Sequence, residues 1–263
     1  MSEARIVCWF SCGAASAVAA HQAIKNSPVD ANIEVVYCDT SADEHPDNER
    51  FLTDVEAWIG QSITRLSSEY NSVEDVFAAH RYMAGIAGAR CTVEMKKKPR
   101  FAYQRADDVH VFGFTSDEQK RIQRFNDGNP ELKTWFPLAE SGTTKEDCYG
   151  ALRDADIEIP AMYLLGYRNN NCIGCVKATS ARYWNMVRRD FPDVFERRAL
   201  QSRDIGVRLT RVRGRRVFLD ELPEDYLAEP LEDISCGPDC GIQPPTEAVS
   251  QKRNDDHDTK EQQ

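Results

Sequence analysis

Short apolar runs alternate with amphipathic segments along the first two thirds of the chain. The runs at 5–10 and 33–38 are rich in β-branched residues and lack a helical period, which predicts two buried strands. Segment 62–67 predicts a third strand and 109–114 a later one. Buried strands separated by helices are typical of a parallel sheet with right-handed crossovers. We therefore expect an open α/β domain.

Helical periodicity fills the intervals between these strands. After the second strand, Phe51, Val55 and Trp58 recur at helical spacing, and acidic residues stand in the first turn. A later segment has Thr143 three residues before Glu146, which is the spacing of a capping box. The sequence therefore predicts helices packed against the sheet.

The pattern changes near residue 184, and we divide the chain there. Residues 1–183 form the predicted α/β domain, and 184–241 predict an extension of one or two helices and a hairpin that turns at Gly214. Residues 242–263 contain few apolar side chains and are expected to be disordered.

Composition narrows the classes of protein that fit. The 263-residue chain is 41% hydrophobic, which allows a substantial core. No apolar run reaches the length of about 18 residues that predicts a membrane span, and the N-terminus lacks a signal pattern. A cytoplasmic protein is expected. The net charge of −10 disfavours a general nucleic-acid coat protein but not a local basic groove.

The loop after the first strand consists of small residues: Ser11, Cys12, Gly13, Ala14 and, after one more alanine, Ser16. A short loop that leads from a strand into a helix exposes unpaired backbone N–H groups, which bind anions. Neither the Walker spacing nor the GxGxxG pattern is present. Phosphate binding and simple close packing of helix on sheet both remain open for this loop.

A second polar segment, which begins with Asp39 and Thr40, follows the second predicted strand. Ligands of open α/β sheets bind beyond the carboxyl ends of the strands, where this segment and the small-residue loop both lie. Asp39 is therefore a candidate for a ribose or metal contact, and the alternative is a helix-capping acid.

The segment FSCGAASAVAA resembles the SGGxDS pyrophosphate loop of the adenine-nucleotide alpha-hydrolase (PP-loop) superfamily, with Ala15 at the place of the usual aspartate. Further segments between 5 and about 180 resemble, in order, those of the phosphoadenosine-phosphosulfate (PAPS) reductase family. The resemblance implies a Rossmann-like sheet with helices on both faces. It also implies a nucleotide, ATP or PAPS, held by the loop and near Asp39 and Thr40, with Mg²⁺ if ATP is used.

Three cysteines match the iron–sulfur branch of this family. Cys91 is separated by 80 residues from Cys172, which forms a C-x-x-C pair with Cys175. The resemblance implies a [4Fe-4S] cluster, and zinc and unliganded redox thiols are the alternatives. A fourth ligand could come from Cys236, Cys240 or Cys148, and Cys240 is our candidate. Alternatively, three ligands leave one iron open to sulfide or substrate sulfur.

The candidate catalytic residues are Cys236, Cys240 and Lys96. The two cysteines lie in SCGPDCG, a loose counterpart of the ECGLH segment that carries the reductases' nucleophile, and ECGLH itself is absent. Lys96 belongs to the basic run after Cys91, which could offset cluster charge or bind an anionic substrate. The alternative is a solvated basic turn.

The predicted hairpin holds six arginines and one aspartate between Arg203 and Arg216. Arginine suits phosphate geometry, so the hairpin is a candidate contact for a nucleic-acid acceptor. The alternative is a solvent-exposed hairpin whose arginines pair with nearby acids. No aromatic residues are interleaved for base stacking.

We expect an enzyme that handles sulfur through an adenine nucleotide. Two reactions fit: sulfonucleotide reduction, or ATP-dependent adenylylation and thiolation of a nucleic-acid or small-molecule acceptor. The alternative is a non-catalytic nucleotide- or nucleic-acid-binding regulator on a degenerate loop. The electron or sulfur donor is unknown, and the sequence does not test whether the protein is a homodimer.

Overall fold

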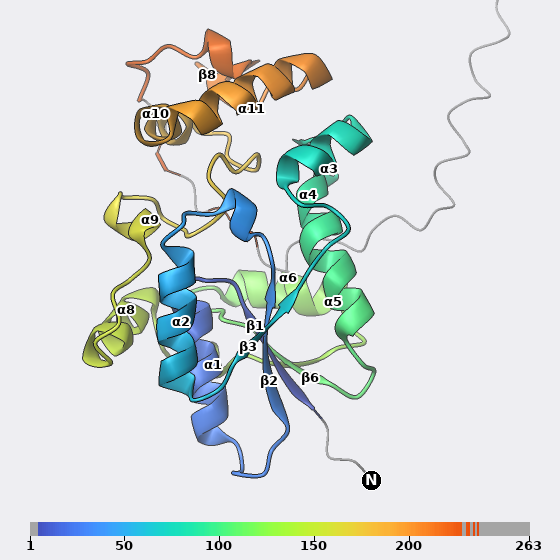
Figure 1. The fold of residues 1–263 in the computed structure, drawn as a ribbon, viewed down its shortest axis with the longest axis vertical. Helices are drawn as coiled ribbons and strands as arrows, with labels where there is room; N and C mark the ends of the chain where they lie inside the picture. The colour runs from blue at the N-terminus through green and yellow to red at the C-terminus, as the bar shows by residue number, and fades with distance from the viewer. Residues whose placement is uncertain (1–4, 228–229, 232–233, 235, 237–263) are drawn as a thin grey trace, which may run out of the picture.

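The computed structural model describes residues 5–227, 230–231, 234 and 236. A five-stranded sheet has the order β3-β2-β1-β6-β7, and every neighbouring pair is parallel. Its strands are β1 (Ile6–Phe10), β2 (Ile33–Cys38), β3 (Ile63–Leu66), β6 (Val109–Val111) and β7 (Lys133–Trp135). The predicted open α/β fold is confirmed, and the sheet lies in the lower half of Figure 1.

Helices cover both faces of the sheet, and the central strand β1 accordingly buries both of its faces. In β1, Cys8 and Phe10 pack toward α1, whereas Val7 and Trp9 join a second apolar cluster on the other face. The first face carries α1 (Ala14–Asn26), α2 (Asn48–Ile59), α7 (Pro137–Glu140) and α8 (Lys145–Asp154). The second carries α5 (Lys98–Tyr103) and α6 (Gln119–Gly128).

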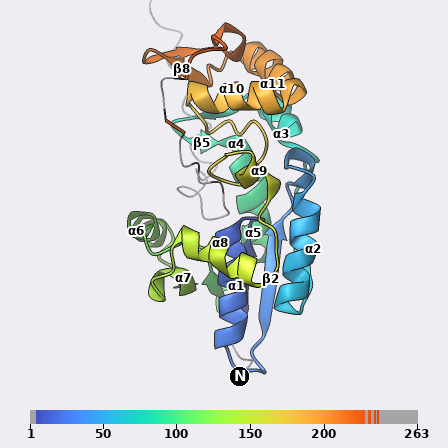
Figure 2. The same ribbon diagram turned by 90° about the vertical axis from the view of Figure 1, so that its left-hand side faces the viewer.

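A separate apolar cluster lies beyond the carboxyl ends of the strands. It joins the C-x-x-C segment to Trp184 and Phe195, which come from the two helices after residue 180. The elements there are α3 (Val73–His80), β4 (Ala84–Gly85), β5 (Gly88–Ala89), α4 (Arg90–Thr92), the π-helical turn η2 (Val93–Lys97), α9 (Ala161–Leu164), α10 (Ala181–Asp190), α11 (Pro192–Ile205), β8 (Thr210–Val212), β9 (Arg215–Val217) and the 3₁₀ turns η1 (Ser41–Asp43) and η3 (Leu219–Glu221). Figure 2 shows α10, α11 and β8 together above the sheet domain.

Two details of the sequence prediction are wrong. The capping box of α8 is formed by Thr144 and Asp147, one residue later than Thr143 and Glu146. The reason is that the Thr143 hydroxyl is engaged with Ser141, so Thr144 is the extended residue that begins the helix. The predicted strand at 109–114 is shorter in the structure and ends at Val111. In the described part of the chain, no helix is both long and apolar enough to cross a bilayer.

A buried imidazole makes the fold sensitive to pH. His110 is 1% exposed and its Nδ1 accepts a hydrogen bond from Trp9 Nε1 at 3.0 Å. Burial lowers the pKa of His110 from 6.5 to about 4. The unfolded chain therefore takes up this proton at a higher pH than the folded chain, and stability is lost as the pH falls through that window.

We expect His110→Gln to be less stable than the wild type at neutral pH. The difference in free energy of unfolding between the two proteins should narrow by about 3 kcal/mol between pH 6.5 and pH 4. The reason is that unfolded wild type binds a proton at His110 that the folded wild type does not hold, whereas the glutamine variant has no such proton. Urea unfolding of both proteins across this range measures the gap. A gap that stays constant with pH would show that His110 is not held neutral by the fold.

Candidate functional site

A cleft opens at the carboxyl ends of β1 and β6. It encloses about 920 Å³, its open mouth included. Its lining combines the small-residue loop with segments far along the chain: Trp9, Ser11, Gly13, Ala15, Ser16, Lys96, Phe112, Gly113, Phe114, Thr115, Asp117, Glu118, Arg121, Lys145, Tyr163, Asn169, Asn170, Asn171 and Cys236. This is the edge at which open α/β sheets bind their ligands.

The small-residue loop is held in shape by Ser16. Its hydroxyl donates to the Gly13 carbonyl at 2.9 Å and accepts from the Ser11 backbone N–H at 3.1 Å. The Ser11 hydroxyl also donates to it at 3.2 Å. The loop is therefore preformed around one buried side chain, and Ser11, Gly13 and Ser16 face the cleft at the N-terminus of α1.

Close packing explains one glycine of the cleft. A Cβ on Gly113 would lie 2.7 Å from both the backbone N and the Cα of Ser16. Since real Cβ atoms essentially never come so close to backbone, a side chain at this position would push the end of β6 and the start of α1 apart. The loop therefore packs tightly against the sheet and also lines an open cleft, and phosphate binding by it stays a prediction.

A second wall of the cleft, which follows Gly113 in the chain, is polar and carries both signs of charge. Thr115 donates its hydroxyl to Asp117 at 2.6 Å and its backbone N–H to Glu118 at 2.9 Å. Glu118 also pairs with Arg121 at 2.6 Å, and the Arg121 guanidinium stacks on Phe114. Asp117 is thus a cleft carboxylate whose described hydrogen-bond partner is a neutral hydroxyl.

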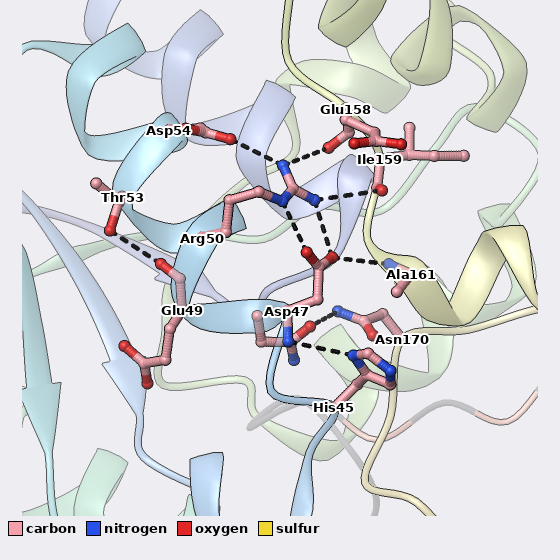
Figure 3. Close-up of polar contacts among 11 residues, drawn as sticks. His45, Asp47, Glu49, Arg50, Thr53, Asp54, Glu158, Ile159, Ala161 and Asn170 are labelled. Carbon is pink, nitrogen blue, oxygen red and sulfur yellow. Dashed lines mark hydrogen bonds and ion pairs between the residues drawn. The ribbon is translucent and has the colours of Figure 1, made fainter.

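The third wall comes from the segment between α8 and the C-x-x-C pair. Asn170 donates to the Cys12 carbonyl at 2.7 Å and to Asn48 at 2.8 Å, which ties this segment to the loop. Asp47 accepts from both Arg50 and the Ala161 backbone N–H, as Figure 3 shows. These contacts fix the position from which α9 presents Tyr163 to the cleft.

Lys96 lies where the cleft meets the cysteines. It belongs to the π-helical turn η2, a local geometry that is frequent at functional sites. The buried Glu94 anchors this turn through Arg90 at 2.6 Å and Lys98 at 2.5 Å. Lys96 is 6% exposed, and its Nζ donates to the Cys236 carbonyl at 2.9 Å. Burial lowers the pKa of Lys96, but the negative charges of Cys236 and Cys172 outweigh this and raise it.

The fold brings four cysteines into one group of thiols: Cys91, Cys172, Cys175 and Cys236. Cys236 comes from far along the chain, since it contacts the hydroxyl of Thr92, which is 144 positions before it. A hydrogen bond with Cys175, then the charges of Lys177 and Lys96, lowers the pKa of Cys236 well below its usual value. The same bond and burial raise the pKa of Cys175. All four are free thiols. We call them the cysteine group.

The cysteine group suits an iron–sulfur cluster better than a single metal ion. Across the described residues, no three His, Cys, Asp or Glu side chains are arranged to hold a single metal ion. Zinc needs its thiolates about 2.3 Å from one ion, whereas an iron–sulfur cluster holds its thiolates at four separate irons. Four soft thiol donors, largely buried and facing two lysines, have the chemistry that such a cluster requires.

Some predicted residues lie outside the cleft lining. Asp39 accepts hydrogen bonds from the Ser41 backbone N–H at 3.0 Å and from its hydroxyl at 2.6 Å, and Thr40 donates to the buried Glu44. Cys12 and Ala14 are buried beneath the loop, at 1% and 0% exposure. Their contacts with a nucleotide stay predictions, as does the role of Cys240, which is outside the described residues.

The sequence reasoning missed several residues of the cleft: Asp117, Glu118, Arg121, Lys145, Tyr163 and Asn169 to Asn171. Lys145 stacks on Tyr163 and donates to the Arg168 carbonyl, so this cation is held at the cleft by its neighbours. A partial signal was available, because Asp117 and Glu118 come soon after a predicted strand end.

The parallel sheet, the preformed loop at a helix N-terminus and the cleft at the carboxyl edge define a Rossmann-like α/β protein of the nucleotide-binding type. The family model for the phosphoadenosine phosphosulfate reductase domain matches residues 5–181. The chain therefore belongs to this family of sulfonucleotide-related proteins, whose members are generally enzymes. Comparison with the curated proteins gave no match.

Proposed function

We propose that this protein is an enzyme that handles sulfur through an adenine nucleotide bound in the cleft. One observation carries the proposal. The cleft is lined both by the preformed loop and by Lys96 and Cys236, and Cys236 is hydrogen-bonded to Cys175 of the cysteine group. A nucleotide whose phosphates rest on the loop would thus extend toward sulfur ligands.

The loop provides the phosphate contacts in this proposal. The first turn of α1 provides backbone N–H groups at the positive end of the helix dipole, where anions bind favourably. The N–H of Ala14 is hydrogen-bonded to the Tyr163 side chain, so a phosphate would use the N–H groups that follow it or displace Tyr163. Ser11 and Ser16 add hydroxyl groups, and Lys96 adds a buried positive charge on the far side. Lys96 thereby balances the anionic end of the nucleotide and the thiolates at the same time.

We propose that Cys91, Cys172, Cys175 and Cys236 hold a [4Fe-4S] cluster. Cys236 takes the fourth place in this assignment, since it is hydrogen-bonded to Cys175. The cluster would supply iron-bound sulfur or a polarising positive charge next to the cleft. Zinc is the alternative occupant, and Cys240 is the alternative fourth ligand.

Two reactions fit this arrangement. In sulfonucleotide reduction, a thiolate attacks the sulfonate sulfur, the bond from sulfur to the phosphate oxygen breaks, and a dithiol donor then releases sulfite. Cys240 is the predicted nucleophile if Cys236 is a ligand. In ATP-dependent thiolation, the loop would hold the leaving pyrophosphate with Mg²⁺. Asp117 is the cleft carboxylate best placed for that ion, because Glu118 is paired with Arg121.

Product analysis of the anaerobically purified protein distinguishes these reactions. Sulfite release from PAPS with a dithiol reductant selects reduction, and pyrophosphate release from Mg-ATP selects adenylylation. We expect one of the two products together with iron and acid-labile sulfide in the protein. A colourless preparation without iron or zinc that binds nucleotide and forms neither product would overturn the proposal in favour of the non-catalytic regulator.

A further inference from the structure

The arginine-rich hairpin of β8 and β9 is formed as a two-stranded ribbon that turns at Arg213 and Gly214. Both turn residues have positive φ, 51° and 78°, as a type I′ turn requires. Glycine adopts this conformation freely, and asparagine or aspartate adopts it more readily than other residues. An arginine at the first turn position therefore has a backbone cost that the turn itself does not explain.

The ribbon also pairs like charges. Arg211 lies directly opposite Arg216 in the antiparallel register, and Val212 lies opposite Arg215. Like charges that face each other across a ladder destabilise it. Arg216 donates to the carbonyl of Leu209 at 2.9 Å, so its guanidinium forms a hydrogen bond that stabilises the fold. Local stability does not account for the remaining arginines.

The interpretation that these arginines pair with nearby acids holds for Arg203. Arg203 bonds both Asp220 and Glu221, at 2.6 and 3.1 Å. By contrast, Arg211, Arg213 and Arg215 are exposed, and no carboxylate among the described residues forms an ion pair with them. Side chains alternate between the faces of a strand, so Arg211 and Arg215 belong to opposite faces of the ribbon and Arg213 lies at its turn. These three unneutralised charges therefore surround the tip of the ribbon and form a local basic surface on a chain of net charge −10.

The basic surface is rigidly attached next to the cysteine group. The Thr179 carbonyl accepts from the Arg211 backbone N–H and from the Thr210 hydroxyl, both at 3.1 Å. Thr179 comes four residues after Cys175. The turn is held from the other side, where the Arg213 backbone N–H donates to Tyr226 at 2.9 Å. The ribbon lies at the end of the molecule toward which the strands' carboxyl ends point (Figure 1).

We propose that Arg211, Arg213 and Arg215 dock the phosphate backbone of double-stranded DNA, with the hairpin tip at the major groove. A two-stranded ribbon fits the major groove of B-DNA, which is about 12 Å wide. The major groove of duplex RNA is too deep and narrow for it. The tip carries no aromatic side chain for stacking on single strands, since Phe218 is buried. The inference deepens the proposed function because it names the acceptor class for thiolation.

Fluorescence anisotropy with a short labelled DNA duplex tests this docking surface. The variant Arg211→Gln/Arg213→Gln/Arg215→Gln should bind DNA about tenfold more weakly than the wild type at low salt. Its slope of log affinity against log salt should be shallower by about 3, because each lost phosphate contact removes about one released counterion. Thermal unfolding confirms that the exposed substitutions leave the fold intact.

A matched control removes the same charge elsewhere. Lys25, Lys133 and Arg153 are exposed residues on α1, β7 and α8, and their triple glutamine variant has the same net charge as the hairpin variant. We expect its DNA affinity to stay within about twofold of the wild type. Equal weakening in both variants would overturn the proposal, since net charge alone would then account for binding.

The choice of duplex DNA is tested with duplex RNA and single-stranded DNA of the same length as competitors. We expect duplex DNA to compete best, and stronger competition by either of the others would refute the assignment. DNA binding is measured without turnover. If wild-type protein binds DNA through the hairpin but forms neither sulfite nor pyrophosphate, the docking surface stands and the proposed function fails. If the protein forms one of these products but does not bind DNA, the proposed function stands and the docking surface fails.

Discussion

Replacing Cys236 by alanine is expected to remove most of the protein's iron and to lower its activity by more than about a hundredfold. In our account Cys236 is the fourth ligand, and it is also the thiol that lines the nucleotide cleft. Its loss therefore affects both the cluster and the end of the cleft where sulfur chemistry takes place. Iron and acid-labile sulfide analysis, with the product assay on the same preparation, measures the two effects.

Cys148→Ala is the matched control for this experiment. Cys148 is also a buried free thiol, but it lies on α8 among the apolar residues that cover the sheet. Its replacement should leave the iron content unchanged. If Cys236→Ala keeps its full iron content and loses only activity, Cys236 is a reacting thiolate and not a ligand, and the four-cysteine assignment is wrong.

Gly113→Ala is expected to weaken nucleotide binding by more than about tenfold and to lower the free energy of unfolding by about 1–3 kcal/mol. The added Cβ would meet backbone atoms of Ser16 at 2.7 Å, and rigid backbone gives way only by moving. The movement would displace the start of α1 and with it the N–H groups that we assign to the phosphates. Isothermal titration with PAPS and with ATP measures the affinity.

Gly128→Ala provides the control, because a Cβ at Gly128 meets no heavy atom within 4 Å. This variant should bind nucleotide as the wild type does. Ser16→Ala distinguishes an effect on the loop from an effect on the stability of the whole protein. It adds no bulk, and it removes the hydroxyl that is hydrogen-bonded to both Gly13 and Ser11. We expect it to lose nucleotide affinity while remaining folded. Unchanged affinity in both Gly113→Ala and Ser16→Ala would exclude the loop as the phosphate site.

Local sequence pattern predicted four of the five strands. The strands β1 and β2 are mostly buried, so their runs of Val, Ile and aromatic residues are continuous and easily recognised. The three-residue strand β7 was not predicted, because it begins with an exposed lysine and has no such run. Local pattern was also less precise at boundaries. The capping box at Thr144 lies one residue after the predicted position, because two adjacent threonines have the same preference for the N-cap of a helix. Only the contact of the Thr143 hydroxyl with Ser141 distinguishes them.

The loop residues, Cys236 and Lys96 were predicted from the sequence as candidates, but cleft residues that no motif marks were missed. Ser11, Gly13 and Ser16 face the cleft because strand, loop and helix follow each other directly in the chain. The place of Cys236 depends on a return of the chain to α4 and η2, which no local pattern encodes. The same is true of Lys145 and Tyr163, which neighbouring elements bring to the cleft.

The prediction for the hairpin was correct in its turn at Gly214 but left the role of the arginines open. Sequence could not distinguish the paired Arg203 from the unpaired Arg211, because the difference lies in which carboxylates the fold brings near. The structure supplies that distinction for the described residues, and it is the basis for the proposed DNA contact.

We propose that an adenine nucleotide binds with its reacting end next to a cluster on the cysteine group. Visible circular dichroism of the anaerobically purified protein, titrated with PAPS and separately with Mg-ATP, tests it most directly. We predict a cluster spectrum that changes and saturates as one of these nucleotides binds. A protein that binds nucleotide with no change in this spectrum, or that has no cluster spectrum at all, would contradict the account.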